Sequence, residues 1–188
     1  MNRDQFQGAS RHLKGRAETA LGSLTGDPGR QVRGAVNQVA GGAQYAYGRA
    51  RDRAAAALAA SAEFAHKDLF FDFNAVGASD VVVVHVPEGV KVADDPIHIM
   101  FAYTNSSVES MLMSNPRVLV VAEKAAEVAI VEEHFGAGEE GGCYWANPVA
   151  EIIIDEGARV VHSYVQHQSF AAAHTKWTVV KQVSLDFR

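Results

Sequence analysis

The stretch VPEGVKV (residues 86–92) recurs in altered form as AEKAAEV (residues 122–128) and as IDEGARV (residues 154–160). Each copy runs from an apolar residue through a charged residue, a glycine or alanine, a small residue and a second charge to a valine. A polar corner of this kind between Val-rich strands is what a stacked β-solenoid requires, because every coil lies on the one before it and the corners stay at the surface. The repeat predicts equivalent corners at Gly89, Ala125 and Gly157.

Strand-like segments surround these corners. Runs rich in β-branched residues predict strands over residues 80–86, 97–103, 118–122, 128–132, 149–154, 160–166 and 176–183. A β-sandwich is the main alternative, but its hairpins would favour two-residue Asn-Gly or Asp-Gly turns, and the sequence has neither pair. We therefore expect stacked parallel strands over residues 80–183 and no helix after Ala65.

The first third of the chain has a different character. Residues 1–62 carry a formal charge of +5 and nine of the sixteen glycines, whereas residues 63–188 carry −10. Such an asymmetry predicts two segments. We place a helical segment with an Ala-rich linker at residues 1–62 and a β segment at residues 63–188.

An internal repeat organises the first segment. Residues 5–22 align with residues 31–48, and seven of the eighteen positions are identical. Helical spacing gives each copy an apolar stripe, and TGDPG (residues 25–29) separates the copies, with Asp27 and Pro28 predicted to begin the second helix. Glycine recurs every seven residues, at positions 8, 15 and 22 and at 34, 41 and 48. This spacing keeps the glycines on one face, where they either allow two helices to approach closely or simply weaken the helices. The stripes contain Phe6, Leu13, Ala17, Leu21 and Leu24, and Val32, Val36, Val39, Ala43 and Ala46.

Several of these motifs resemble the CsbD family of small, mostly helical and often stress-induced bacterial proteins. They are MNRDQFQG (residues 1–8), LKGR (13–16), LGSLTGD (21–27), GAVNQVAG (34–41) and YG (47–48). The resemblance implies no catalytic residues. The segment lacks the tight basic cluster of a nucleic-acid-binding surface. It fits a transit peptide only loosely, because targeting peptides need no ordered repeat.

A second set of motifs resembles the SufB/SufD family, and in particular the plastid-type SufD proteins. They are DPIHI (95–99), SNPRVLV (114–120), IVEEHF (130–135), CYWAN (143–147), HSYVQHQ (162–168) and HTKW (174–177). The resemblance implies a right-handed parallel β-helix and a scaffold role in iron–sulfur cluster assembly beside SufB-like and SufC-like partners. The CsbD-like segment replaces the family's helical region, and the later coils do not follow. We therefore expect a truncated β-helix.

The weak candidates for metal ligands are Cys143, His162, His167 and His174. His162 and His167 are five residues apart, which places them on opposite faces of one strand. A single cysteine excludes an internal disulfide and a zinc site of several thiolates. An iron–sulfur cluster usually has four cysteine thiolates as ligands, or histidines in place of some of them. We expect the chain alone to bind no cofactor, so an iron–sulfur cluster would require a partner. Otherwise these side chains are ordinary polar residues of the coils.

Glu132, Glu133 and His134 form an acid/base cluster without an evident nucleophile, and no phosphate-binding loop is present. The chain has no run of 18 apolar residues that would predict a membrane span. The main hypothesis is a soluble, non-enzymatic scaffold component of iron–sulfur cluster assembly, as a fragment or a fusion, with no nucleic-acid or membrane partner. A CsbD-like stress-response protein is the alternative, and a metal-binding solenoid is a weaker one. The SufD resemblance implies a plastid location and the CsbD resemblance a bacterial cytoplasm. A natural fusion, a truncated gene and a mis-assembled gene all remain open.

Overall fold

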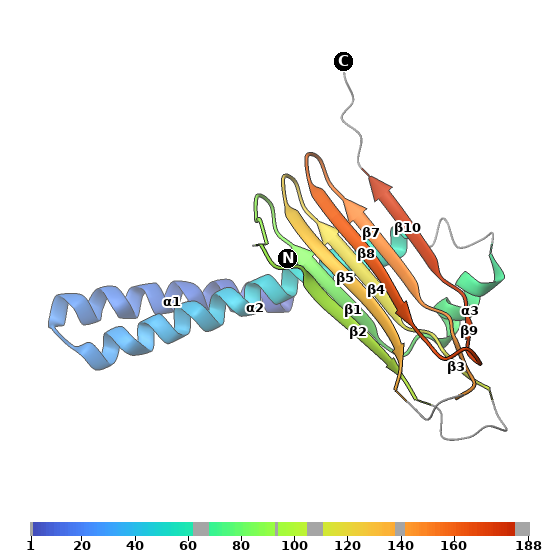
Figure 1. The fold of residues 1–188 in the computed structure, drawn as a ribbon. Helices are drawn as coiled ribbons and strands as arrows, with labels where there is room; N and C mark the ends of the chain where they lie inside the picture. The colour runs from blue at the N-terminus through green and yellow to red at the C-terminus, as the bar shows by residue number, and fades with distance from the viewer. Residues whose placement is uncertain (1, 62–67, 93, 105–110, 138–141, 183–188) are drawn as a thin grey trace, which may run out of the picture. The chain divides into compact units, whose positions relative to one another are not determined.

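A computed structural model describes residues 2–61, 68–92, 94–104, 111–137 and 142–182. The chain divides into two compact units, Met1–Ala56 and Ala57–Arg188. A pair of helices is followed by a short helix and parallel strands (Figure 1). The predicted bounds at residues 62 and 63 stay a prediction. The elements are α1 (Arg3–Thr25), α2 (Pro28–Ser61), α3 (Leu69–Gly77), β1 (Val81–Val86), β2 (Ile97–Tyr103), β3 (Leu112–Ser114), β4 (Arg117–Ala122), β5 (Glu127–Gly136), β6 (Tyr144–Ala146), β7 (Val149–Ile154), β8 (Arg159–His167), β9 (Ala173–His174) and β10 (Trp177–Gln182).

The ends of the first two helices follow local capping rules. The Asn2 side chain accepts a hydrogen bond from the backbone N–H of Gln5 and caps α1. Gly26 ends α1 in the left-handed conformation, with φ of 65°, which glycine adopts without a steric cost. Asp27 Oδ1 accepts from the backbone N–H of Arg30 at 3.0 Å, so the predicted start of the second helix is confirmed.

The glycines form the contact between α1 and α2. Gly8, Gly15 and Gly22 are the buried residues of α1. A Cβ atom added to Gly15 would lie 2.6 Å from the carbonyl oxygen of Gly34, and one added to Gly41 would lie 2.4 Å from the backbone nitrogen of His12. Real Cβ atoms do not approach backbone atoms so closely. The seven-residue glycine spacing therefore serves close approach of the two backbones.

The apolar stripes do not form this contact. Phe6, Leu13 and Leu24 are 64%, 67% and 84% exposed, and the valines of the α2 stripe are exposed as well. At 100° per residue, each stripe lies on the helix face opposite the glycines. Close backbone packing therefore joins the two helices, together with side-chain hydrogen bonds such as those from Asn2 to the Gly48 carbonyl and from Gln38 to Thr19. The larger apolar side chains face outward.

Replacing Gly41 by alanine should destabilise the hairpin by about 1–3 kcal/mol, because the new methyl group overlaps backbone atoms of α1. Gly42→Ala is the matched control, since nothing lies within 4 Å of its added Cβ. It should stabilise α2 by up to about 1 kcal/mol through helix propensity alone. Native-state amide exchange of α1 and α2 measures both changes. Equal effects of the two substitutions would contradict the glycine contact.

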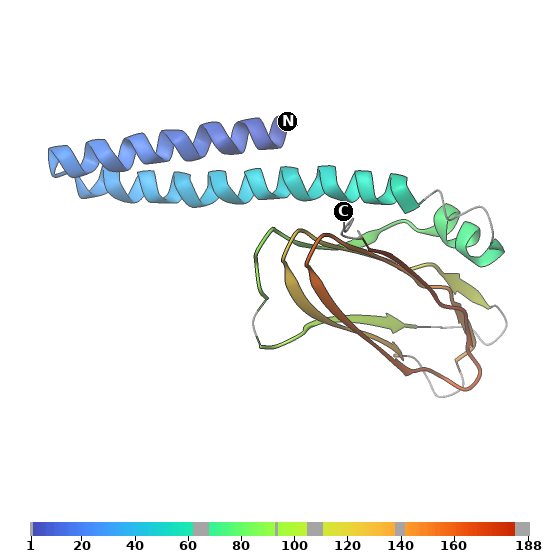
Figure 2. The ribbon, with the colours of Figure 1, turned by 90° about the horizontal axis from the view of Figure 1, so that it is seen from above.

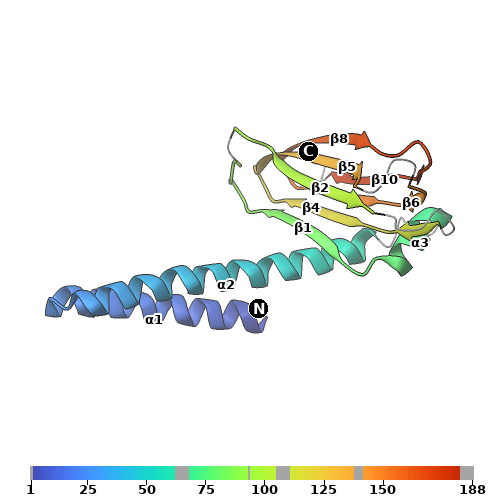
Figure 3. The same cartoon turned by 60° about the horizontal axis from the view of Figure 1, so that its bottom comes forward.

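The β unit contains three parallel sheets, and each takes every third strand. Their orders are β1-β4-β7-β10, β2-β5-β8 and β3-β6-β9. One pass of the chain through all three sheets is called a circuit below, and successive circuits lie one behind another (Figure 2). The sheet of β2, β5 and β8 lies opposite that of β1, β4 and β7 (Figure 3), and aliphatic side chains from both fill the space between them.

The predicted corners are equivalent. Gly89, Ala125 and Gly157 have φ of 70°, 56° and 67°. Each is the third residue of a turn closed by a backbone hydrogen bond. The backbone N–H groups of Gly89 and Ala125 also donate to carbonyl oxygens at the corner of the next circuit, those of Lys124 and Glu156, both at 2.9 Å. A positive φ at the third position is the geometry of a type II turn, which favours glycine. The seven-residue repeat therefore encodes this backbone conformation.

The predicted strands are all present, with bounds that shift by a few residues. The short strands β3, β6 and β9 have too few residues for a visible alternation and were not predicted. The expectation of no helix after Ala65 is wrong, because α3 spans Leu69–Gly77. Asp68 caps it by accepting from the N–H groups of Phe70 and Phe71, and the buried Asn74 anchors it to backbone carbonyls of the β unit. A nine-residue helix shows little periodicity, and it depends on this tertiary anchoring.

Ala125→Gly should stabilise the β unit by about 0.5–1 kcal/mol, because it relieves a left-handed conformation that costs alanine about 1–2 kcal/mol. Gly157→Ala should destabilise it by about 1 kcal/mol for the same reason, since nothing lies within 4 Å of the added Cβ. Urea unfolding followed by fluorescence of Trp145 and Trp177, the two tryptophans of the sequence, measures both. Loss of stability in Ala125→Gly would contradict the corner geometry.

Candidate functional site

A cluster of charged and aromatic side chains lies inside the β unit, beyond the aliphatic core. Alternation along β5 directs Val128, Ile130, Glu132 and His134 to the interior. The first two belong to the aliphatic core, whereas Glu132 and His134 are fully buried polar residues. The interior therefore changes from apolar to polar along a single strand.

Glu132 is the centre of this cluster. Its Oε1 atom accepts hydrogen bonds from His134 Nε2 at 2.7 Å and from Lys176 Nζ at 2.5 Å, and its Oε2 atom accepts from His162 Nε2 at 2.8 Å. His134 lies on the same strand, whereas His162 is on β8 and Lys176 precedes β10. One buried carboxylate thus binds donors from the second and third circuits and from the segment that leads to β10.

The cluster continues toward the first circuit through Tyr103. Its hydroxyl lies 2.6 Å from His134 Nδ1, and Phe101 stacks on the His134 ring at 4.8 Å. Because Glu132 holds no proton to give, we assign the Nε2 proton of His134 to that hydrogen bond, so Tyr103 donates to Nδ1. Tyr103, His134 and Glu132 form a continuous hydrogen-bonded chain.

The surroundings fix the charge states of this cluster. Burial alone would raise the pKa of Glu132, but hydrogen bonds from His134 and His162 and the charge of Lys176 hold that pKa well below its ordinary value. Burial lowers the pKa of Lys176, and the facing carboxylate opposes this shift. Burial also raises the pKa of Tyr103 far above 10. The phenol is therefore a hydrogen-bond donor rather than a nucleophile at neutral pH.

His174 lies at the edge of the same cluster, where its Nε2 atom contacts the hydroxyl of Tyr164. Burial, with contributions from His134 and Lys176, lowers the pKa of His174 to about 4. The Lys176 ammonium lies 5.0 Å from the centre of the Tyr164 ring. A neutral imidazole, a phenol and a paired ammonium give this end of the cluster no unbalanced charge.

A different set of side chains lies on the outer face of the same sheet. Glu133, one residue from Glu132, points outward and contacts His98 Nε2 at 2.7 Å and His167 Nδ1 at 3.3 Å. His162 and His167 therefore lie on opposite faces of β8, as their spacing predicts. The sequence cluster of Glu132, Glu133 and His134 is likewise divided between the interior and the surface.

Of the four candidate metal ligands, His162 and His174 belong to the interior cluster, whereas His167 and Cys143 lie elsewhere. His162 binds Glu132, His174 contacts Tyr164, His167 contacts Glu133 on the outer face, and Cys143 is half-buried just before β6. Within the described ranges, no three histidine, cysteine, aspartate or glutamate side chains are arranged to hold a metal ion. A metal role for any of the four stays a prediction.

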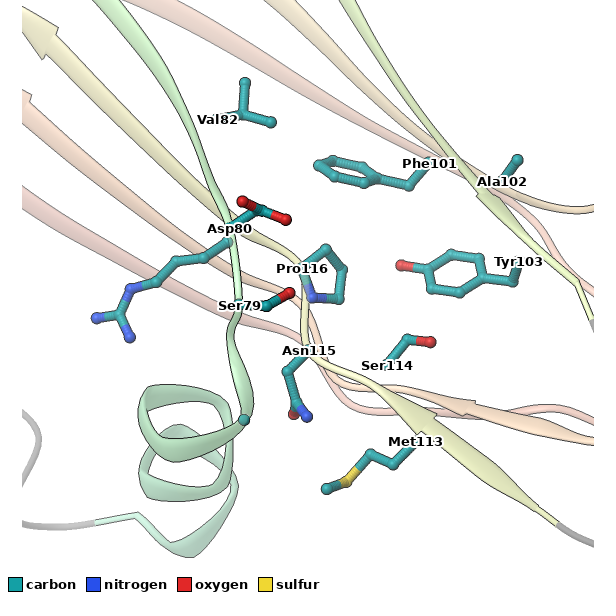
Figure 4. A pocket seen from close by; sticks show the side chains of 12 residues that line it. Ser79, Asp80, Val82, Phe101, Ala102, Tyr103, Met113, Ser114, Asn115 and Pro116 are labelled. Carbon is teal, nitrogen blue, oxygen red and sulfur yellow. The ribbon is translucent and has the colours of Figure 1, made fainter.

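A pocket of about 420 Å³ opens beside the first circuit (Figure 4). Its lining combines apolar Val82, Phe101 and Met113 with polar Asp80 and the Tyr103 ring. The Tyr103 hydroxyl points into the pocket in this view. Since its proton is directed to His134, this hydroxyl can only accept a hydrogen bond from a molecule in the pocket. The pocket thus adjoins the interior cluster through one phenol.

Sequence reasoning missed much of this arrangement. Tyr103, Tyr164 and Lys176 were not singled out, because residues far apart in the sequence meet here only through strand register. A further buried pair, Arg117 and Glu151, joins β4 to β7 with a hydrogen bond of 2.6 Å from Arg117 Nε. The two-residue alternation from Val128 to His134 is the one signal that could have placed Glu132 and His134 inside.

Comparisons with known proteins match both halves of the chain. A CsbD-like family model matches residues 4–56. A model described as SUF system FeS cluster assembly, SufBD core domain, matches residues 103–184. The chain belongs to the CsbD-like family through its N-terminal segment and carries a SufBD core domain in its C-terminal part. Both resemblances found in the sequence are thereby confirmed.

Individual relatives agree with this division. The chain is 47% identical to the chloroplastic protein ABCI7 of Arabidopsis thaliana over 118 residues, which are 61% of this chain and 24% of that protein. It is 30% identical over 121 residues, again 61% of this chain, to an iron–sulfur cluster assembly SufBD family protein of Synechocystis sp., of which it covers 26%. The CsbD-like domain is 40% identical over 53 residues, 28% of this chain, to a UPF0337 protein of Mesorhizobium japonicum, of which it covers 86%.

The chain spans about a quarter of the length of the Arabidopsis and Synechocystis relatives. No solved structure matches it. Among the described helices, none is long and apolar enough to cross a membrane.

Glu132→Gln should destabilise the SufBD core domain by about 3–5 kcal/mol, because it leaves the buried ammonium of Lys176 without a counter-charge. Glu133→Gln, the same change one residue along on the outer face, should cost less than about 1 kcal/mol. Adding Lys176→Met to Glu132→Gln should recover part of the loss. Urea unfolding compares the three variants. Equal losses in Glu132→Gln and Glu133→Gln would show that the interior carboxylate has no special role.

Proposed function

We propose that this chain is a SufD-like, non-catalytic scaffold component of iron–sulfur cluster assembly. The observation that carries the proposal is the 47% identity to a chloroplastic relative over 118 residues, together with the SufBD core match over residues 103–184. The name of the Synechocystis relative supports the same pathway. The proposal includes that the chain is a fragment or a fusion, which its coverage of about a quarter of the Arabidopsis and Synechocystis relatives supports.

The proposal also assigns the β unit to a specific type of fold. The three sheets are the walls of a truncated right-handed parallel β-helix, and each circuit is one turn. Three features support this: every third strand joins the same sheet, the corners at Gly89, Ala125 and Gly157 share one geometry, and an aliphatic core lies between the sheets. Parallel strand crossovers are almost always right-handed, which supports the assigned hand.

The interior cluster suits a structural role better than a catalytic one. Three donors occupy the Glu132 carboxylate, so it is a poor general base. The high pKa of Tyr103 and the committed proton of its hydroxyl oppose nucleophilic attack. We infer that the domain contributes surface and rigidity to an assembly, and that an iron–sulfur cluster forms only with ligands from a partner.

The partners proposed by resemblance are SufB-like and SufC-like proteins, and the chloroplastic relative supports a plastid location. Neither nucleic acid nor a membrane enters the proposal. The CsbD-like domain, matched over residues 4–56, keeps a bacterial stress-response protein as the alternative.

The test combines binding with reconstitution. The full chain is mixed with a SufB-like and a SufC-like protein and analysed by size-exclusion chromatography. Each mixture is then incubated with iron and sulfide without oxygen, and visible absorption reports the cluster. We expect a complex with the SufB-like protein, no cluster on the chain alone and no effect of Cys143→Ser on the chain alone. Failure to bind the SufB-like protein would overturn the scaffold role. A cluster on the chain alone that Cys143→Ser abolishes would favour a metal-binding function instead.

A further inference from the structure

The exposed faces of α1 and α2 carry side chains at a regular spacing, and the proposed function assigns no role to these faces. In α1 the outward positions are Phe6, Ser10, Leu13, Ala17, Ala20 and Leu24, and in α2 they are Val32, Val36, Val39, Ala43 and Ala46. Their spacing alternates between four and three residues in both helices, and all are exposed. This is the 3.5-residue period of a coiled-coil seam, in which apolar side chains of one helix pack between those of another.

The glycines show that both seams face away from the hairpin. With the seam residues at positions a and d of the heptad, Gly8, Gly15 and Gly22 take position f, and so do Gly34, Gly41 and Gly48. Position f lies diametrically opposite the seam, and these glycines contact the partner helix. The two seams therefore lie on opposite outer faces of the hairpin, and neither has a partner among the described residues of this unit.

The charges beside the seams have one sign. Positions e and g, which flank the seam, hold Lys14 and Arg16 in α1 and Arg33 and Arg49 in α2, and no acidic residue. All four carboxylates of the unit have contacts within the hairpin. Asp4 pairs with Arg51, Asp27 caps α2, and Asp52 accepts from Asn2 and Gln5. Glu18 accepts from Asn37 and lies 3.9 Å from the ammonium of Lys14, which remains largely exposed.

We propose that the seams of the CsbD-like hairpin bind an amphipathic α-helix whose flanking positions are acidic. The 3.5-residue period selects a helix, and the small seam residues Ala17, Ala20, Ala43 and Ala46 allow its backbone to approach closely. The basic flanks select acidic residues at the partner's e and g positions. A second copy of this hairpin would place basic flanks against basic flanks. A flat bilayer surface could cover only one of the two seams, because they lie on opposite faces of the hairpin, and it would leave the other exposed.

The test uses synthetic peptides and the full chain. A fluorescent peptide of about four heptads, long enough for a stable coiled coil, carries Leu and Ala in its seam and Glu at e and g. A matched peptide carries Lys at e and g. Fluorescence anisotropy should show binding of the Glu peptide only. Binding should weaken in about 1 M salt, where charges more than about 3 Å apart are screened.

Variants of the chain separate the seam from its flanks. Lys14→Glu with Arg16→Glu should weaken binding of the Glu peptide by about tenfold or more, a change of about 1.4 kcal/mol. Arg30→Glu is the control for a charge reversal outside the seam, because Arg30 lies beside Asp27, and it should have little effect. Leu13→Asn should weaken binding while far-UV circular dichroism shows an unchanged helix content, as expected for a side chain that is 67% exposed.

Several results would overturn the proposal. Equal binding of the Glu and Lys peptides would remove the role of the flanks, and binding of neither would remove the seam. Self-association in sedimentation experiments that Leu13→Asn abolishes would assign the seam to a second copy. Stronger binding to phosphatidylglycerol vesicles than to the Glu peptide would assign it to a membrane surface.

Discussion

The carboxylate of Glu132 is the point at which the circuits of the β unit meet. It accepts hydrogen bonds from His134 on its own strand, from His162 on the next circuit and from Lys176 before β10, and His134 extends the network to Tyr103 on the first circuit. A buried charge is tolerated only when such partners surround it. The parallel strands must therefore pair in one register, because a slip of a single residue would move the side chains of the slipped strand to the opposite face.

The helical hairpin obeys a different constraint. Its helices are held by glycines that bring two backbones together, so the hydrophobic effect contributes little to this contact, and the larger apolar side chains remain outside. Most amphipathic helices bury their apolar stripe inside their own domain. In this hairpin, the face that makes the fold and the face available for binding lie on opposite sides of each helix.

The two parts thus differ in what their surfaces and interiors offer. The SufBD core domain supplies a rigid stack of strands with a polar interior whose charges are balanced. The CsbD-like domain supplies an extended surface with basic flanks. The pocket lined by Tyr103 lies beside this polar interior.

The sequence by itself determined the features that repeat locally. The corner motif predicted equivalent turns, because a positive φ favours glycine at a fixed position, and the seven-residue spacing placed the glycines on one face of each helix. It also separated His162 from His167 by simple alternation. Only the tertiary structure decided that the glycines, rather than the apolar stripes, join the helices, that α3 forms around Asp68 and Asn74, and that Tyr103 and Lys176 join the cluster around Glu132. The contacts of Tyr103 with His134 and of Lys176 with Glu132 span 31 and 44 positions of the sequence, so they form only when the parallel strands pair in the correct register.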